Sequence, residues 1–247
     1  MLKTHNGLKN HYTEISDIHY DFRNANLYQL ILRYLKGQSL LDIGCGPGHF
    51  IYLAKQCGYH ATGIEPDDSL IRLAKKLYPT DRLNIKWGSA EDLSLEKTVD
   101  NITMIDVLEH IKQDKEILSR LSKHLSSSGR IILVVPSHPS LYGLRDHSVG
   151  HYRRYTKSQL RELLSNCGMN IVKLRHWNAL GVIPFYISEK VLRRPLHTKI
   201  RNTKKQKGLN SLLAKSLFIW FKFVEGHINF RFGLSLICVA EVKNRKT

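Results

Sequence analysis

The sequence predicts an α/β protein built on a doubly wound, mostly parallel sheet of seven strands, with a helical insertion before the last strand. Short apolar segments with strand character alternate with amphipathic helical segments from residue 39 to residue 177. Such alternation implies right-handed crossovers between parallel strands. The segment 131–135 is apolar without a break, as expected of a strand covered on both faces. With 247 residues, the chain is long enough for one such domain.

The predicted elements follow one another in a regular order. An amphipathic helix over 21–36 ends at Gly37 and leads into the first strand. Thr156 and Gln159 form the capping-box pattern that begins a later helix. We expect one domain over 1–247, with an N-terminal helical cap at 1–38 and a basic helical insertion at 178–232. The other elements are expected, in order, as strand 39–43, helix 49–57, strand 59–64, helix 68–78, strand 84–87, strand 101–105, helix 113–125, strand 130–135, a polar loop to 155, strand 170–177, an apolar stretch at 179–192, a helix at 209–224 and strand 235–242.

The net charge of +17 is confined to the second half of the chain. Residues 1–129 carry 16 Lys/Arg and 16 Asp/Glu, whereas residues 130–247 carry 22 Lys/Arg and 5 Asp/Glu. Eight cations between residues 190 and 207 have no acid among them. Such a run is as consistent with a solvated loop as with a surface that faces an anion.

The cysteine spacing and the hydropathy pattern limit the cellular setting. The four cysteines are widely separated and suggest neither a disulfide framework nor a structural metal site. The first twenty residues contain no apolar signal region, and no stretch reaches the roughly 18 to 20 apolar residues of a membrane span. We therefore expect a cytoplasmic protein, with peripheral contact at the inner membrane surface as a further hypothesis.

The segment LLDIGCGPG, residues 40–48, joins the first predicted strand to the next helix through three glycines. Glycine allows the backbone to approach a ligand closely and to adopt positive φ angles. Glu65 follows Gly44 by 21 residues, at the end of the second predicted strand, where a carboxylate can accept hydrogen bonds from both ribose hydroxyls. This spacing suits a nucleoside.

A dinucleotide enzyme is the nearest competing interpretation of the same turn. Its G-x-G-x-x-G pattern would need a glycine at position 49, which is His49 here. Asp42, just ahead of the glycines, would also repel a pyrophosphate, whereas it suits the amino-acid end of a cationic sulfonium. The pattern therefore favours S-adenosylmethionine.

Six motifs give the chain a resemblance to the class I S-adenosylmethionine-dependent methyltransferases. They are LLDIGCGPG, GIEPD, GSAEDL, DVLEHI, GRIILVVPS and GHYRRYT, and they extend over about residues 40–164. The resemblance implies a Rossmann-like fold, with the glycines around the methionine moiety and Glu65 on the ribose. The family usually has Asp at the position of Ser89, so Glu91 is a second candidate for the adenine contact. The expected cofactor-binding residues are Asp42, Gly44, Cys45, Gly46, Gly48, Glu65, Pro66, Ser89, Ala90, Glu91 and Asp106.

The acceptor is expected beyond the carboxyl ends of the fourth and fifth predicted strands. Methyl transfer is an in-line displacement, so the enzyme aligns the acceptor, excludes water and, where needed, removes a proton. The candidate bases are His151, His147 and His110. The expected substrate contacts, which include two arginines suited to an anionic group, are Tyr20, Glu109, Tyr142, Asp146, Arg153, Arg154 and Tyr155.

Two other interpretations of the loop between residues 137 and 155 remain open. Asp146, His147, His151 and Glu109 offer oxygen and nitrogen ligands, although our main interpretation includes no metal. Alternatively, Asp146 forms an internal ion pair with one of the two neighbouring arginines, 153 or 154, and thereby orders the loop.

GHYRRYT followed by a helix is similar to the small-molecule branch of the family, near the quinone-biosynthesis methyltransferases. The segment after the fourth strand is IDVLEH, not the Asn/Asp-Pro-Pro-aromatic motif of DNA amino-methyltransferases, and no cysteine falls where RNA cytosine-5 enzymes need one. We therefore expect methyl transfer to an oxygen of a small or lipid-like acceptor. The alternatives are an RNA-binding or RNA-modifying methyltransferase that uses the basic half, and a non-catalytic interaction module.

The insertion alternates apolar patches with cations. Its helices are interpreted as packing on the sheet or against a second copy, or as lying in a membrane interface with Trp220, Phe221 and Phe223 at the boundary. They are equally consistent with a cap over the acceptor pocket. Nucleic acid is the least favoured partner of the insertion.

Overall fold

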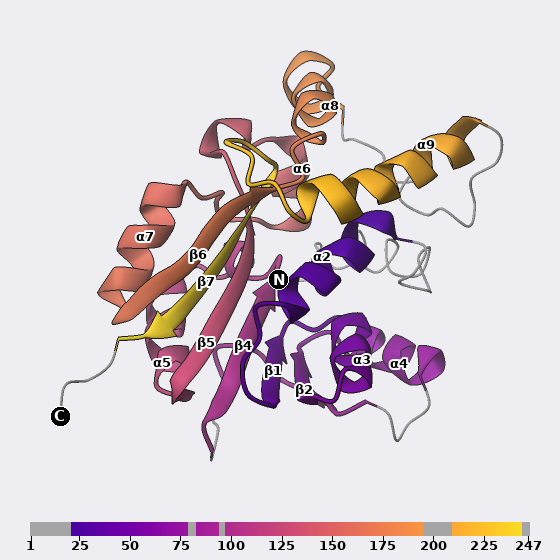
Figure 1. Cartoon of the computed structure of the whole chain (residues 1–247). Helices are drawn as coiled ribbons and strands as arrows, with labels where there is room; N and C mark the ends of the chain where they lie inside the picture. The colour runs from indigo at the N-terminus through magenta and orange to yellow at the C-terminus, as the bar shows by residue number, and fades with distance from the viewer. Residues whose placement is uncertain (1–20, 79–82, 94–96, 195–208, 244–247) are drawn as a thin grey trace.

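The computed structural model describes residues 21–78, 83–93, 97–194 and 209–243 (Figure 1). Among these, seven strands form one sheet in the order β3-β2-β1-β4-β5-β7-β6. The first five strands pair in parallel, and β7 is antiparallel to both of its neighbours, so the predicted mostly parallel, doubly wound sheet is confirmed. The strands are β1 (Ser39–Ile43), β2 (His60–Glu65), β3 (Ile85–Trp87), β4 (Val99–Ile105), β5 (Leu125–Pro136), β6 (Met169–Trp177) and β7 (Ser235–Val242).

Helices cover both faces of the sheet (Figure 1). On one face α5 (Asp114–Ser122) and α7 (Lys157–Asn166) contribute to a core that includes Ile131, Leu133 and Val135 of β5. On the other face α2 (Phe22–Leu32) and α3 (His49–Gln56) contribute to a second core that includes Ile132 and Val134. Alternate residues of β5 thus enter opposite cores, which explains its uninterrupted apolar sequence. The helix α4 (Asp68–Leu77) follows β2.

Most predicted boundaries agree with the structure to within a few residues, but β5 begins earlier than expected. The strand starts at Leu125, which pairs with Val99 before a register shift leads to the pairing of Arg130 with Asn101. Its first residues are mainly serines, so the hydropathy pattern contains no signal for this part of the strand. The capping box of Thr156 and Gln159 is confirmed at the start of α7.

The connections at the carboxyl ends of the parallel strands contain short helices. The 3-10 turns η2 (Leu108–His110) and η3 (Pro139–Leu141) follow β4 and β5, and α6 (Leu144–Val149) lies within the segment predicted as a polar loop. Between β6 and β7, α8 (Val182–Tyr186) continues into the π-helical turn η4 (Ile187–Val191), and α9 (Leu209–Ile219) continues into η7 (Trp220–Glu225). No helix in the described part of the chain has the length and apolar character needed to cross a bilayer.

Candidate active site

The glycine turn after β1 adopts the backbone conformation that its sequence predicts. Gly44, Gly46 and Gly48 have φ angles of 67°, 56° and 78°, in the left-handed region that glycine adopts without strain. A Cβ atom on Gly44 would lie 2.5 Å from Cγ2 of Val107, which follows β4. The turn is therefore held close to the end of β4, and there is no room for a side chain between them.

Two buried carboxylates lie beside the turn. The Glu65 carboxylate at the end of β2 accepts hydrogen bonds from the backbone N–H of Gly46 (2.7 Å) and of Asp67 (2.9 Å). The Asp42 carboxylate accepts a hydrogen bond from Oγ1 of Thr103 on β4 (2.6 Å). Burial raises the pKa of Asp42 to about 7, and the charge of Glu65 adds to this rise, whereas the Thr103 hydrogen bond opposes it. Two acids in such a site favour a ligand group of positive charge.

The other residues expected to bind the cofactor lie at or after the carboxyl ends of β1 to β4. Cys45 and Ala90 are buried and Glu91 is exposed. The Pro66 carbonyl accepts a hydrogen bond from Nε1 of Trp87 (3.1 Å), and the Ser89 hydroxyl donates one to Asp92 (2.8 Å). These positions agree with a cofactor that crosses the ends of the strands. The cofactor contacts themselves stay predictions.

Arg23 contacts Asp106, one of the residues expected to bind the cofactor, although Arg23 itself was not among the expected residues. Its Nη1 atom lies 3.3 Å from Oδ2 of Asp106, which follows β4 with a φ of 54°, and its Nη2 atom donates to the hydroxyl of Ser235 (3.2 Å). The helix α2 is thereby tied to the sheet beside the predicted cofactor site. The sequence carries no signal for this contact, because Arg23 precedes Asp106 by 83 residues.

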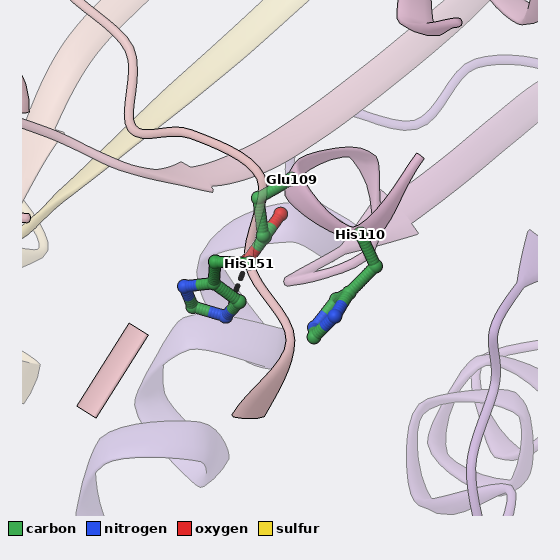
Figure 2. Close-up of side chains that lie close together, drawn as sticks. All are labelled: Glu109, His110 and His151. Carbon is green, nitrogen blue, oxygen red and sulfur yellow. Dashed lines mark ion pairs between the residues drawn. The ribbon is translucent and has the colours of Figure 1, made fainter. Parts of the chain in front are cut away.

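Side chains from two distant segments meet near the end of β4 (Figure 2). Glu109 and His110 belong to η2, and His151 follows α6; their ligand atoms all lie within 4.8 Å of one another. The Nε2 atom of His151 lies 3.7 Å from Oε1 of Glu109, and the rings of His110 and His151 are nearly perpendicular at 4.6 Å between centroids. We call these three residues the acceptor cluster.

A buried ion pair orients His151 from behind. The Nδ1 atom of His151 lies 2.7 Å from Oδ1 of Asp146, and Nε of Arg154 donates to Oδ2 of the same carboxylate at 2.9 Å. Burial alone would raise the pKa of Asp146, but the hydrogen bonds from His151 and Arg154 outweigh it and hold this pKa below its ordinary value. Arg154 also donates to the carbonyl of Ser137 (3.2 Å). The internal ion pair that we considered for Asp146 is thus present, with Arg154.

Glu109 is surrounded differently from Asp146. Its carboxyl oxygens are buried without a hydrogen-bond partner among the described residues. Burial, and then the charge of Asp106, raise the pKa of Glu109 well above its ordinary value. At neutral pH we therefore expect Glu109 to be a neutral carboxyl group that faces His151.

The remaining residues expected around the acceptor lie at the edge of the cluster or outside it. His147 is exposed, with its ring perpendicular to that of Tyr142, whose hydroxyl donates to the carbonyl of His151 (2.6 Å). Arg153 pairs with Asp114 (2.8 Å), which also accepts from the Tyr155 hydroxyl (2.9 Å). Tyr20 lies outside the described residues. Substrate contact by Arg153 and Arg154, and catalysis by His147, stay predictions.

The fold and this site define the chain as an S-adenosylmethionine-dependent methyltransferase of class I, as the resemblance of its motifs predicted. A glycine turn with positive φ angles, and two acids beside it, lie where the resemblance of the motifs places the cofactor. A family model described as a methyltransferase domain matches residues 18–174. The chain therefore belongs to this methyltransferase family.

Comparisons with curated and solved proteins agree with this assignment. The chain is 33% identical over 117 residues to the mitochondrial ubiquinone biosynthesis O-methyltransferase of Schizosaccharomyces pombe. The aligned region covers 45% of this chain and 40% of that protein. The chain thus matches about two fifths of the length of this relative. The resemblance to quinone-biosynthesis methyltransferases is confirmed at this level of similarity.

Solved structures share the fold at low sequence identity. A chain from the complex of the Haloferax volcanii Trm112 methyltransferase activator with a methyltransferase superposes with a TM-score of 0.65 at 11% identity, over 99% of this chain and 98% of that one. A SAM-dependent methyltransferase from Archaeoglobus fulgidus gives 0.56 at 19% identity, over 88% and 91% of the two chains. At such identities these likenesses concern the fold alone.

Proposed function

We propose that the chain transfers the methyl group of S-adenosylmethionine to an oxygen of a small or lipid-like acceptor, with His151 as the general base. The observation that carries this proposal is the 2.7 Å contact between Asp146 and Nδ1 of His151. An ionised Asp146 favours the tautomer with the proton on Nδ1, and Nε2 on the side of Glu109 can then accept a proton.

The presence of an oriented base favours oxygen over nitrogen as the acceptor atom. A hydroxyl group becomes a good nucleophile only as its proton leaves, whereas a neutral amine already carries an available lone pair. The sulfonium of the bound cofactor supplies an activated methyl carbon. The neutral carboxyl expected at Glu109 would donate a hydrogen bond to the acceptor and help to align its oxygen with that carbon. The name of the O-methyltransferase relative supports the same acceptor atom.

The proposal is tested first by calorimetry of the full chain with S-adenosylhomocysteine and then by transfer of a labelled methyl group. Paired acceptors, a catechol and the matching aminophenol, each with and without an isoprenoid tail, distinguish oxygen from nitrogen and small from lipid-like substrates. We expect O-methylated products, and a loss of turnover of about 100-fold or more in His151→Gln with unchanged cofactor affinity. Absence of S-adenosylhomocysteine binding at millimolar concentration, or methylation of nitrogen alone, would contradict the proposal.

A divalent cation at the acceptor cluster is a second candidate for part of this function. The structure brings Glu109 and His151 together with His110, whereas Asp146 lies behind His151 and the exposed His147 is not one of the grouped ligands. A carboxylate that holds the second ring nitrogen of a histidine is the usual arrangement around metal-binding histidines. Imidazole and carboxylate ligands suit several divalent metals, which would orient an acceptor hydroxyl and lower its pKa.

Direct binding measurements distinguish the cation from the simple base. The full chain, dialysed against a chelator, is titrated with Zn²⁺ and with Mn²⁺ in a calorimeter, and the experiment is repeated with His110→Ala. A cation at the cluster requires binding by the wild-type chain that is weakened at least about tenfold in the variant. Equal binding by both chains, or none, would leave His151 as a base without a metal.

A further inference from the structure

Exposed apolar side chains are concentrated in the insertion at 178–232, outside the segment that matches the methyltransferase family. Of the sixteen large hydrophobic residues that are exposed in the described part of the chain, twelve belong to this insertion. We call them the insertion surface: Leu180, Ile183, Tyr186, Ile187, Val191, Leu192, Leu212, Leu213, Ile219, Phe223, Ile228 and Phe232. So many exposed apolar groups on one segment mark a site of interaction.

These side chains recur at helical spacing on the two arms of the insertion. On α8 and η4, Ile183 and Val191 are 69% and 62% exposed and lie eight residues apart, with Ile187 midway between them. On α9 and η7, the exposed Ile219 and Phe223 are four residues apart. Such spacing gives each arm an apolar stripe along one side. Figure 1 shows α8 and α9 projecting from the same end of the sheet.

In the described part of the insertion, the exposed charge has one sign. Residues 178–232 contain 11 Lys/Arg and 2 Asp/Glu. Both acids, Glu189 and Glu225, are buried. Among the described residues of the insertion, the exposed charged side chains are therefore all cations: Lys190, Arg193, Arg194, Lys215, Lys222 and Arg231.

One of the two buried acids, Glu225, holds the end of the insertion to β6. The Glu225 carboxylate accepts hydrogen bonds from the backbone N–H of Asn178 (2.8 Å) and of Ala179 (2.6 Å), where the chain leaves β6. Arg175 of β6 donates in return to the carbonyls of Glu225 and Ile228. These buried and partly buried hydrogen bonds fix the insertion surface relative to the sheet.

The insertion also contacts the segment that carries the acceptor cluster. The guanidinium group of Arg154 lies over the ring of Phe185 in α8, 4.6 Å from its centroid. The Glu189 carboxylate accepts a hydrogen bond from the backbone N–H of Arg145 in α6 (3.2 Å). The insertion surface and the residues that support His151 are therefore parts of one packed unit.

We infer that the insertion surface docks onto the face of an anionic lipid bilayer. Apolar side chains would enter the boundary between headgroups and acyl chains, while the neighbouring cations pair with lipid phosphates. An anionic bilayer would interact with both the apolar side chains and the cations of the insertion. A nucleic acid would use the cations and leave the apolar stripes in water, and a twofold contact between copies would place cations against cations. The inference does not depend on which atom the enzyme methylates.

Flotation of the full chain with lipid vesicles tests the inference. Vesicles of phosphatidylcholine alone are compared with vesicles that also contain phosphatidylglycerol, and RNA binding is titrated in parallel. We expect binding to the anionic vesicles that weakens with added salt and is much weaker with neutral lipid. A chain that stays unbound with both kinds of vesicle overturns the inference.

Paired substitutions separate the apolar contribution from the charge. The variant Ile183→Gln with Val191→Gln keeps every charge, and we expect its affinity for anionic vesicles to fall at least about tenfold. Val172→Gln is the matched control, because Val172 is 51% exposed on β6 outside the insertion; it should bind vesicles like the wild type. Charge reversal of Lys215 and Lys222 to Glu should also weaken vesicle binding.

Three outcomes contradict the bilayer as the partner. Wild-type vesicle binding by the Ile183→Gln, Val191→Gln variant would show that charge alone acts, as in binding to RNA. Unchanged vesicle binding after charge reversal of Lys215 and Lys222 would show that these cations do not pair with lipid phosphates. Sedimentation that finds a wild-type dimer, dissociated by the two glutamines, would assign the surface to a second copy of the chain. Thermal unfolding of each variant verifies that it is folded.

Discussion

The glycine turn and the acceptor cluster lie at the ends of adjacent strands, β1 and β4, yet they are built in different ways. The turn is mainly backbone, and the Glu65 carboxylate accepts a hydrogen bond from the backbone N–H of Gly46 within it. The cluster consists of side chains from η2 and from the segment after α6, and it depends on the ion pair of Asp146 with Arg154. The turn is therefore sensitive to the addition of a single carbon atom, whereas the cluster is sensitive to charge and to the position of a proton.

The largest effect is expected from Asp146→Asn in the acceptor cluster. The asparagine has the same size, but its amide can donate to Nδ1 of His151 and so stabilise the wrong tautomer. We expect turnover to fall about 100- to 1000-fold while the affinity for S-adenosylhomocysteine stays within about twofold, measured by single-turnover kinetics and calorimetry. Equal losses in turnover and cofactor affinity would mean that Asp146 supports the cofactor site instead.

His147→Gln is the matched control for that experiment. His147 belongs to the same helix, α6, but is exposed, and its ring lies against Tyr142. If His151 is the base, this variant should keep turnover within about threefold of the wild type. A loss as large as that of Asp146→Asn would transfer the catalytic role to His147.

The next largest effect is expected from Gly44→Ala in the turn. The added Cβ would adopt an unfavourable φ and meet Val107, so the turn must move away from the end of β4. We expect the affinity for S-adenosylhomocysteine to fall at least about 100-fold, equivalent to about 2.7 kcal/mol. Gly58→Ala is the control, because Gly58 also has a positive φ but its Cβ would meet no atom within 4 Å. The same loss of affinity in both variants would show general strain, not a cofactor contact.

The different construction of the glycine turn and the acceptor cluster also explains how much of each could be predicted from the sequence. The turn and Glu65 lie within one strand-turn-helix-strand segment, where the periodicity and the glycine spacing fix their relative positions. The sequence also identified Asp146, His151 and Arg154, but it left open which arginine pairs with Asp146. The choice depends on α6, a helix of six residues that is too short to leave a periodic pattern.

Long-range contacts could not be predicted at all. Arg23 of α2 contacts Asp106, but the sequence pattern of this helix identifies only its apolar face and not the partner of Arg23. The inward position of Glu225 likewise depends on how β6 and the insertion fold together, because the carboxylate binds the backbone of Asn178 and Ala179. In both cases the partner lies more than 40 residues away, beyond the range of helical or strand periodicity.

A smaller effect is expected from pH, and it concerns the cofactor site. Because the pKa of Asp42 is raised to about 7, this carboxyl group is largely protonated below pH 7 when no cofactor is bound. A cofactor with a positively charged amino group prefers the ionised form, so affinity should rise by up to about tenfold per pH unit until pH 7 and then level off. Calorimetry from about pH 5.5 to about pH 8.5, on both sides of the pKa of Asp42, measures how the affinity depends on pH. The substitution Asp42→Asn should remove this dependence. An unchanged slope in the variant would assign the titration to another group.

The smallest effect on turnover is expected from Glu109→Gln. Burial raises the pKa of Glu109 well above its ordinary value, so we expect the wild-type group to be neutral at pH 7, and glutamine would then preserve its charge, its size and one hydrogen-bond donor. Turnover at pH 7 should therefore change by no more than about threefold. A much larger loss would mean that an ionised Glu109 is required, as a metal ligand would be.

The unfolding free energy of Glu109→Gln supplies a second measurement with a definite sign. A carboxyl group whose pKa is raised on folding retains its proton in the folded state at pH values where the unfolded state has lost it. The stability of the wild-type chain must then decrease as pH rises from the ordinary glutamate pKa towards the raised value of Glu109. Glutamine has no proton to lose, so the variant should show a flatter dependence of the unfolding free energy on pH. Parallel pH dependence in the two chains would mean that Glu109 is ionised in the folded protein, and the cation at the acceptor cluster would become the better explanation of how this site works.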